Sequence, residues 1–379
     1  MINLKDISKT YPGESKPAVD NLSLEIDEGE ICILVGPSGC GKTTTLKMIN
    51  RLIEPSSGKI FINGQDAINQ NPNKLRQDIG YVIQDIGLFP HMTVAENIAT
   101  VPKLKDWDQA KIDERIDELL NLIGLNPADT KDKYPAQLSG GQKQRIGVAR
   151  AMAVDPPIML MDEPFAAVDP ITRTQLQNEF LSLQKKIQKT ICFVTHDIDE
   201  AIKMGDKIAI LNQGRLIQSD SPKNILFNPK NEFVEDFVGS DRSLKVLNLI
   251  KVSEIMKKNI PTATTQSSPK EVLDKINDSR QSYILVIDKG EKLIGYVNKK
   301  RMKSNSNKNW KENIKYSQVI SSDASLIDAL SRLIQNNQSI LPVTSDENNL
   351  IGIVKLKDIQ DKIADSYQAE SELEEPEVV

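Results

Sequence analysis

The sequence of 379 residues contains no long hydrophobic run. Its longest apolar stretches, such as residues 31–35, hold about five residues, whereas a helix that spans a bilayer needs about 20. The first residues, Met-Ile-Asn-Leu-Lys-Asp, do not have the pattern of a signal peptide. The sequence therefore predicts a chain that does not itself cross a membrane.

Cysteine is rare, and basic residues are not in excess. The three cysteines, Cys32, Cys40 and Cys192, lie far apart without Cys-x-x-Cys spacing, which indicates reduced thiols in a cytosolic protein. The net charge of −5 argues against nucleic acid as a partner, because proteins that bind it generally carry a basic surface. The length predicts two or three domains.

Residues 36–43 read Gly-Pro-Ser-Gly-Cys-Gly-Lys-Thr and fit the phosphate-binding pattern Gly-x-x-x-x-Gly-Lys-Thr at every fixed position. The β-branched stretch 31–35 predicts a buried strand before this loop, and residues 44–52 predict a helix after it. In that setting the backbone N–H groups of the loop and the N-terminus of the helix can hold a phosphate. A plain glycine-rich turn is the alternative, which the flanking residues disfavour.

Polar and charged residues follow three further predicted strands. Gln84 ends one strand, Asp162 and Glu163 end a second, and His196 follows a third. Ligands of open α/β sheets bind along the carboxyl edge of the strands. We therefore expect these four side chains to lie at the same edge as the phosphate loop.

Other segments predict the surroundings of this edge. Residues 2–11 and 18–26 predict two strands of a small antiparallel sheet. At the end of the first, Tyr11 either stacks on a nucleotide base or is an ordinary edge-strand tyrosine. Residues 107–125 predict an amphipathic helix. The sequence Leu-Ser-Gly-Gly-Gln at 138–142 precedes another predicted helix and forms a second candidate anion site.

With these motifs in this order, residues 1 to about 238 resemble the ATP-binding subunit of an ABC transporter. The matching motifs are the Walker A loop at 36–43, the Q-loop at Gln84, the signature at 138–142, Walker B with its following glutamate at 158–163, the D-loop at 167–169 and the switch histidine His196. The resemblance implies an α/β fold, in which a P-loop NTPase core of ABC type carries antiparallel β and helical subdomains.

The resemblance also implies roles for individual residues. The implied ATP-binding residues are Tyr11, Gly36, Pro37, Ser38, Gly39, Cys40, Gly41, Lys42, Thr43 and Thr44. The implied ligands of Mg²⁺ are Thr43, Gln84 and Asp162. The implied catalytic residues are Glu163, His196 and Gln84. In this family two subunits form a homodimer, and the ATP of the partner subunit contacts the signature residues Ser139, Gly140, Gly141 and Gln142. Asp169 is the implied aspartate of the D-loop.

An internal repeat lies in the second half of the chain. Residues 282–286 and 293–297 align, at a constant offset of 57, with 339–343 and 350–354. Each copy has a predicted helix followed by two strands, and a copy of about 50 residues is too small to bury a core alone. The repeat resembles a tandem pair of α+β CBS modules, which bind adenine nucleotides and dimerise. A ligand sensor and a purely structural dimerisation element are both open.

The usual ribose and phosphate contact of such modules is Gly-x-x-Thr/Ser-x-x-Asp. Here the second copy keeps Asp358 but has Lys355 at the hydroxyl position, and the first copy has Arg301 in place of the aspartate. These three residues are the candidate ligand contacts. The cationic replacements suit a more anionic ligand, such as cyclic di-AMP, a regulator of osmolyte transporters of this kind. Alternatively, Lys299, Lys300 and Arg301 form a solvated charged face.

The predicted boundaries are an ATP-binding domain at 1–238, a linker at 239–250, CBS modules at 251–310 and 311–363, and an acidic tail at 364–379. The tail is expected to be disordered, and a role in sensing ionic strength is the competing idea.

This architecture most resembles the energising subunit of bacterial glycine betaine, carnitine and choline importers. The resemblance implies ATP hydrolysis at the cytoplasmic face of the membrane, with permease subunits, an extracytoplasmic substrate-binding protein, and regulation by the CBS pair. The alternatives are another class of ABC importer and a soluble ABC ATPase that acts on DNA or ribosomes. The single nucleotide domain and the acidic balance disfavour the last.

Overall fold

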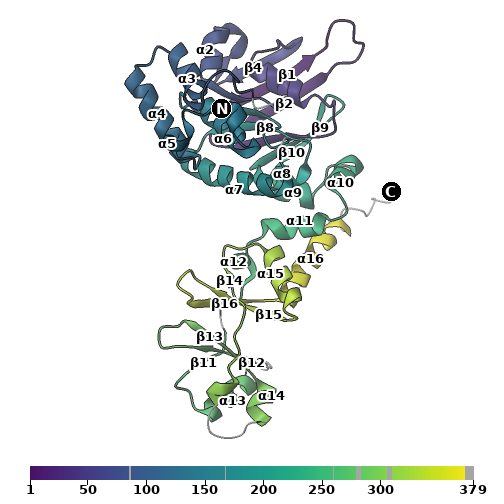
Figure 1. Cartoon of the computed structure of the whole chain (residues 1–379). Helices are drawn as coiled ribbons and strands as arrows, with labels where there is room; N and C mark the ends of the chain where they lie inside the picture. Colours follow the sequence, from purple (N-terminus) through teal and green to yellow (C-terminus); the bar gives the residue numbers. More distant parts are fainter. Residues whose placement is uncertain (85–86, 167, 259, 279–282, 305–309, 372–379) are drawn as a thin grey trace, which may run out of the picture. The chain divides into compact units, whose positions relative to one another are not determined.

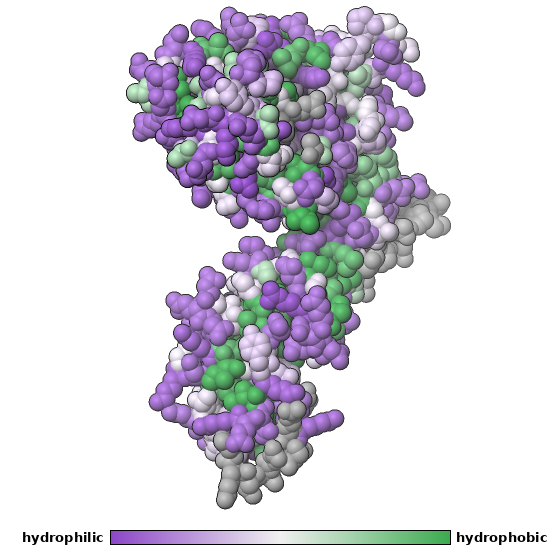
Figure 2. Space-filling model, viewed as in Figure 1, coloured by the Kyte–Doolittle hydropathy of each residue, from purple (hydrophilic) through white to green (hydrophobic). Residues whose placement is uncertain are grey.

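The structure, a computed structural model, describes residues 1–84, 87–166, 168–258, 260–278, 283–304 and 310–371 (Figure 1). The chain divides into two compact units, Met1–Gly239 and Ser240–Val379. Hydrophilic residues predominate on the visible face of the first unit (Figure 2). Each unit is described by itself.

A six-stranded sheet forms the centre of the first unit, in the order β10-β9-β3-β8-β7-β6. The strands are β3 (Ile31–Val35), β6 (Ile79–Val82), β7 (Ile158–Asp162), β8 (Thr190–Val194), β9 (Lys207–Asn212) and β10 (Arg215–Asp220). All are parallel except β10, which pairs antiparallel with β9. Every residue of β3, β7 and β8 is buried, because helices cover both faces of parallel sheets. The carboxyl ends of these strands therefore reach one edge together.

A four-stranded sheet lies beside the central one, in the order β2-β1-β4-β5. Its strands are β1 (Ile2–Lys9), β2 (Val19–Ile26), β4 (Ser57–Ile62) and β5 (Gln65–Asp66). They pair antiparallel, so the sheet predicted from the N-terminal residues is confirmed. Buried residues of both sheets, such as Ile26 and Leu34, share one hydrophobic core, which fixes the two sheets relative to each other.

Helices pack on the central sheet, while β1, β2 and β4 lie at the outer side of the unit (Figure 1). The helices of the unit are α1 (Lys42–Ile49), α2 (Pro72–Gln77), α3 (Val94–Leu104), α4 (Gln109–Leu122), α5 (Pro127–Thr130), α6 (Gly140–Ala151), α7 (Pro170–Ile187), α8 (Ile198–Met204), α9 (Pro222–Phe227) and α10 (Glu232–Val238), with the 3-10 turns η1 (Ala67–Asn69) and η2 (Pro135–Gln137). Helices α4 and α6 both pack on α3. The amphipathic pattern predicted α4 correctly, since Ile112, Ile116 and Leu119 are buried along one face.

The second unit contains two three-stranded sheets of the same topology. Their strands are β11 (Thr262–Thr264), β12 (Tyr283–Ile287) and β13 (Leu293–Asn298), then β14 (Ile320–Ser321), β15 (Ile340–Thr344) and β16 (Leu350–Lys355). In each sheet the first two strands pair parallel and the last two antiparallel. The remaining elements are α11 (Arg242–Leu249), α12 (Val252–Ile255), α13 (Pro269–Asp278), α14 (Lys299–Ser304), η3 (Trp310–Asn313), α15 (Leu326–Gln335) and α16 (Leu356–Ser371). The repeat in the sequence is a repeat in structure.

The two copies contact each other directly. The N–H of Leu293 donates to the carbonyl of Asn348 at 3.1 Å, and the N–H of Leu350 donates to the carbonyl of Glu291 at 3.0 Å. Buried residues of the first copy also pack with Ile353 of the second in a shared hydrophobic cluster. As expected for copies of this size, each completes its burial against the other.

The structure differs from the sequence-based expectation at both ends of the second unit. The segment 239–250, expected to be a linker, contains α11, which packs on α15 and α16. The helix is stabilised because Val246 and Leu247 are buried. The polar residues at the start of the segment give no indication of this burial in the sequence. At the other end, α16 runs to Ser371, into the expected tail. Residues 372–379 of that tail lie outside the described residues.

Leu247→Ala is expected to lower the free energy of unfolding of the second unit by about 2–5 kcal/mol, because Leu247 is fully buried. Leu244→Ala in the same helix is the matched control, since Leu244 is 48% exposed. Urea denaturation of the whole chain, followed by hydrogen exchange in the two units, measures both. Equal small losses would show that α11 behaves as a linker.

Candidate functional site

The phosphate loop between β3 and α1 has a backbone that only glycine adopts easily. Gly36, Gly39 and Gly41 have φ angles of 151°, 79° and 103°, a region that disfavours residues with a Cβ atom. A Cβ atom on Gly41 would lie 2.4 Å from the carbonyl oxygen of Ala18. The glycines thus allow both the turn and a close approach of neighbouring backbone. The other loop residues named from sequence, Pro37, Ser38, Cys40 and Thr44, lie in or directly beside this turn.

Lys42 begins α1 and folds back over the loop. Its side chain is buried, and its ammonium group donates to the carbonyls of Gly36 at 2.7 Å and Pro37 at 3.0 Å. The Cys40 thiol is buried beneath this loop, and burial raises its pKa. A thiol in that state is a packing residue and not a nucleophile.

Thr43 and Asp162 meet at the sheet edge. The Thr43 hydroxyl donates to Asp162 Oδ1 at 3.0 Å. Burial raises the pKa of the Asp162 carboxyl, so a nearby cation would favour its charged form. A hydroxyl and a carboxylate are oxygen ligands of the type that Mg²⁺ prefers beside a phosphate. The third residue named for Mg²⁺, Gln84, bonds to Glu163 instead.

Glu163 is held between two side chains from neighbouring strand ends. Gln84 Nε2 donates to Glu163 Oε2 at 3.1 Å, and His196 Nδ1 lies 3.3 Å from Glu163 Oε1. Glu163 has a φ of 46°, and such strained residues cluster at functional sites. The three residues that sequence analysis named as catalytic are therefore in contact, and both carboxylate oxygens of Glu163 are engaged.

The signature and D-loop residues each begin a helix. Ser139 and Gln142 form a reciprocal cap on α6: the N–H of Gln142 donates to Ser139 Oγ at 3.2 Å, and the N–H of Ser139 to Gln142 Oε1 at 3.0 Å. This leaves Gly140 exposed in the first turn. Asp169 caps α7 through the N–H of Thr172 at 3.1 Å, a bond that lowers the pKa of Asp169. The N-terminus of α6 faces solvent and suits an anion from outside, whereas the Asp169 carboxylate already occupies the N-terminus of α7.

Two further residues named from the sequence are Tyr11 and Ala167. Tyr11 follows β1 and is 37% exposed, with the Lys9 ammonium 5.6 Å from its ring centroid. This contact leaves stacking on a base and an ordinary edge-strand role both open. Ala167 of the D-loop lies outside the described residues.

A buried carboxylate near the site was not predicted from the sequence. Glu200 in α8 is 7% exposed and accepts a hydrogen bond from Gln177 Nε2 at 2.8 Å. Burial raises the pKa of Glu200. Together with Glu163 and His196 it lines a small pocket. Glu200 belongs to the short helix Ile198–Met204, whose first turn is acidic and typical of a surface segment. The sequence therefore gives little indication that Glu200 is buried.

In the second unit, no hydrogen bond or ion pair among the described side chains joins the candidate ligand residues Lys355 and Asp358 to each other. Asp358 Oδ1 accepts from Lys257 Nζ at 2.7 Å, while Asp358 Oδ2 is buried and has no partner among the described residues. Lys355 ends β16. Arg301 belongs to α14, but its side chain lies outside the described residues. The ion pair with Lys257 already neutralises the one aspartate that the sequence retains.

A cleft of about 200 Å³ lies between the two copies instead. It is lined by residues of both, among them Tyr283, Tyr296 and Asn298 of the first and Gln338 of the second. The hydroxyl of Tyr283 and Oε1 of Gln338 are buried and have no hydrogen-bond partner in the described part of the chain. Burial raises the pKa of Tyr283 to about 12. Because its residues come from two separate segments, no local motif indicates this cleft.

Family models match both halves of the chain. The model of the ABC transporter family matches residues 19–166, and the model of the CBS domain matches residues 252–305 and 314–365. Among the described residues, no helix combines the length and apolar character needed to cross a membrane.

Two similar proteins align over nearly the whole chain. The carnitine transport ATP-binding protein OpuCA of Listeria monocytogenes is 44% identical, over 100% of this chain and 99% of its own length. The glycine betaine/carnitine/choline transport ATP-binding protein OpuCA of Bacillus subtilis is 45% identical, over 98% of each chain.

The fold of the first unit has solved relatives. The dimeric ATP-binding cassette MJ0796, in a post-hydrolysis state bound to ADP and Pi, is 34% identical with a TM-score of 0.53, over 59% of this chain and 99% of that one. These matches confirm the predicted fold class, an ATPase of the ABC type. The chain belongs to the family of ABC transporter ATP-binding subunits that carry CBS domains. Family membership implies the use of ATP and Mg²⁺.

Gly41→Ala is expected to weaken ATP binding by at least about tenfold, because the new methyl group would overlap the Ala18 carbonyl and displace the loop. Gly39→Ala is the matched control: its φ is also positive, but a Cβ atom there meets nothing within 4 Å. Backbone strain alone costs about 1–2 kcal/mol. Calorimetric titration with ATP compares the two, and equal losses would contradict the role given to the overlap.

Proposed function

We propose that this subunit hydrolyses ATP to energise the import of a quaternary ammonium solute, such as glycine betaine, carnitine or choline, through a separate permease. The observation that carries the proposal is the similarity over the full length, CBS domains included, to subunits named for carnitine and for glycine betaine, carnitine and choline transport. The substrate would contact the permease and an extracytoplasmic binding protein. The subunit would then lie at the cytoplasmic face of the membrane.

The proposed chemistry follows from the contacts at the sheet edge. Glu163 is assigned as the general base that orients the attacking water and accepts its proton. Gln84 and His196, bonded to its two oxygens, hold the carboxylate in position. When Gln84 turns toward the phosphates, one oxygen of Glu163 is released for the water. His196 is 59% exposed, so it is free to reach the γ-phosphate.

The phosphates are assigned to the loop and to Lys42. For the ammonium group to bind them, it must exchange its bonds to the carbonyls of Gly36 and Pro37 for phosphate oxygens, a charge-assisted contact that is stronger. Thr43 and Asp162, with Gln84, would hold Mg²⁺, which supplies positive charge against the phosphate oxygens when it is bound.

The signature residues are assigned to the ATP of a second copy. Within one chain, no hydrogen bond among the described residues joins 139–142 to the phosphate loop, and the first turn of α6 is open to solvent. A homodimer with two-fold symmetry would complete each ATP site with the Ser139 helix of the partner subunit. The dimeric state of the related cassette supports this arrangement.

We assign residues 1–238 to the ATP-binding domain and 251–310 and 311–363 to the two CBS modules, with α11 as part of the second unit. The CBS pair is proposed to regulate the ATPase by binding a nucleotide, with cyclic di-AMP as the candidate. The cleft at Tyr283 supports a purine-binding role, because aromatic residues and unsatisfied polar atoms line it. Its volume of about 200 Å³ is below the roughly 300–1,000 Å³ of typical ligand pockets, so the cleft would hold one base of the dinucleotide while the rest of the ligand lies outside it.

Glu163→Gln is expected to leave ATP binding intact and to lower ATP turnover by at least about a hundredfold, the usual scale for loss of a general base. Glutamine keeps the shape and the contacts to Gln84 and His196 but cannot accept the proton. Turnover of the purified variant, with ATP affinity as the control, tests this assignment. In vesicles carrying the cognate permease, uptake of labelled glycine betaine, carnitine or choline should fall in parallel. If the wild-type protein supported uptake of none of the three solutes, the proposed substrate class would be wrong.

Cyclic di-AMP is expected to bind the full chain, and Tyr283→Ala to weaken that binding by at least about tenfold, as a lost stacking contact does. Tyr316→Ala is the matched control, because Tyr316 is 77% exposed and lies outside the cleft. Calorimetry measures the affinity for cyclic di-AMP, AMP and ATP. The chain used carries Lys42→Ala, which blocks its ATP site. No heat with any of the three would favour a purely structural CBS pair.

A further inference from the structure

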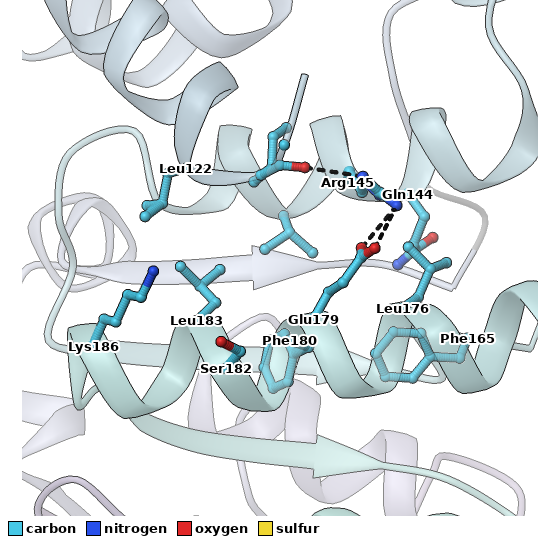
Figure 3. A pocket seen from close by; sticks show the side chains of 13 residues that line it. Leu122, Gln144, Arg145, Phe165, Leu176, Glu179, Phe180, Ser182, Leu183 and Lys186 are labelled. Atoms are coloured by element: carbon cyan, nitrogen blue, oxygen red, sulfur yellow. Dashed lines mark hydrogen bonds and ion pairs between the residues drawn. The ribbon is translucent and has the colours of Figure 1, made fainter. Parts of the chain in front are cut away.

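A pocket of about 380 Å³ lies away from the ATP site, between the end of α4, helix α6 and helix α7 (Figure 3). Its volume lies within the range of about 300–1,000 Å³ that is typical of small-molecule sites. None of the nucleotide-binding or CBS residues named above lines it. The pocket opens to solvent on the side where Ser182 and Lys186 are exposed, so a molecule from outside can enter it.

The wall of the pocket is mostly apolar. On α7, Leu176, Phe180 and Leu183 recur at helical spacing and face the pocket. Phe165 packs edge-to-face on Phe180, with ring centroids 6.2 Å apart, and closes the floor. Apolar side chains that line a void lack packing partners on one side. An apolar molecule would supply those partners.

One buried polar side chain in this wall has no partner. Gln144 of α6 is 3% exposed and lines the pocket. Its side-chain amide makes no hydrogen bond within the part of the chain that the structure describes. Figure 3 shows its amide group pointing from α6 toward α7. The amide is accessible from the pocket, so Gln144 can form a hydrogen bond with a polar group of a bound molecule.

The charged groups of the wall are not equivalent. Arg145 Nη2 binds both oxygens of Glu179, at 2.9 and 2.8 Å, and Nη1 donates to the carbonyl of Ile123 at 3.2 Å. These two charges neutralise each other. Lys186 has no such partner among the described residues, and its ammonium group points from α7 into the opposite end of the pocket from Gln144 (Figure 3). The net charge that the wall offers to a ligand is therefore positive and lies at Lys186.

We propose that this pocket binds a small amphipathic anion. Its acidic group pairs with Lys186, its apolar body lies against Phe180 and Leu183, and a polar group at its far end bonds to Gln144. Leu176, opposite Gln144, and Lys186 are separated by about 15 Å along α7, at 1.5 Å per residue, which sets the length of the ligand to a medium chain. The site is independent of the ATP site and of the proposed transport function.

The test uses the full chain and calorimetric titration with three probes below their micelle concentrations: decanoate, 10-hydroxydecanoate and decyltrimethylammonium. We expect decanoate to bind, 10-hydroxydecanoate to bind more tightly through Gln144, and the cationic probe not to bind. Equal binding of decanoate and the cation would show nonspecific apolar association and would overturn the proposal, as would the absence of binding by both carboxylates.

Two pairs of variants locate the site. Lys186→Glu should weaken decanoate binding by about tenfold, because an attractive charge becomes a repulsive one. Lys185→Glu is the matched control, since Lys185 is an exposed neighbour that does not line the pocket, and it should change affinity less than about twofold. Gln144→Leu should abolish the advantage of 10-hydroxydecanoate over decanoate while leaving decanoate bound. Equal effects of the two lysine variants, or an unchanged preference in Gln144→Leu, would place binding elsewhere.

Discussion

The parallel alignment of β6, β7, β8 and β3 is the constraint on which the ATP site depends. These strands pair in register, so each delivers the one or two residues that follow its last paired residue to the same edge. Glu163 meets Gln84 on one side and His196 on the other because their strands are neighbours. Since all of β7 is buried, a slip in its register would move both the core and the carboxylates. Stability and chemistry are thus set by the same hydrogen bonds.

Much of this site is predictable from the sequence for a local reason. The glycine spacing of the phosphate loop and the polar residues at strand ends are short patterns, and each acts within a few residues of itself. These short patterns do not predict the contacts between the residues that they identify. That Gln84 bonds to Glu163 and not to Thr43 or Asp162 depends on side-chain reach across two strands. The burial of Glu200 depends on Gln177, which belongs to another helix.

The second unit shows the limit of local patterns more clearly. Residues 239–250 begin with Gly-Ser-Asp-Arg-Ser, a composition typical of linkers. The helix there is stabilised by α15 and α16, which occur much later in the sequence. The cleft at Tyr283 and Gln338 likewise requires both copies at once. Only the periodicity of the repeat, and not these long-range contacts, is visible in the chain itself.

The contacts of α11 and α12 also determine the order in which the second unit can fold. Helix α11 precedes the first CBS copy and α12 begins it, yet α11 packs on α15 and α16, and the N–H of Val252 donates to the carbonyl of Ala324 at 2.9 Å. On the ribosome they emerge before the residues that cover them. Helix α11 therefore lacks its packing partners until α16 has been made, so this unit can finish folding only after α16 has left the ribosome. The interval exposes apolar surface of the kind that chaperones bind.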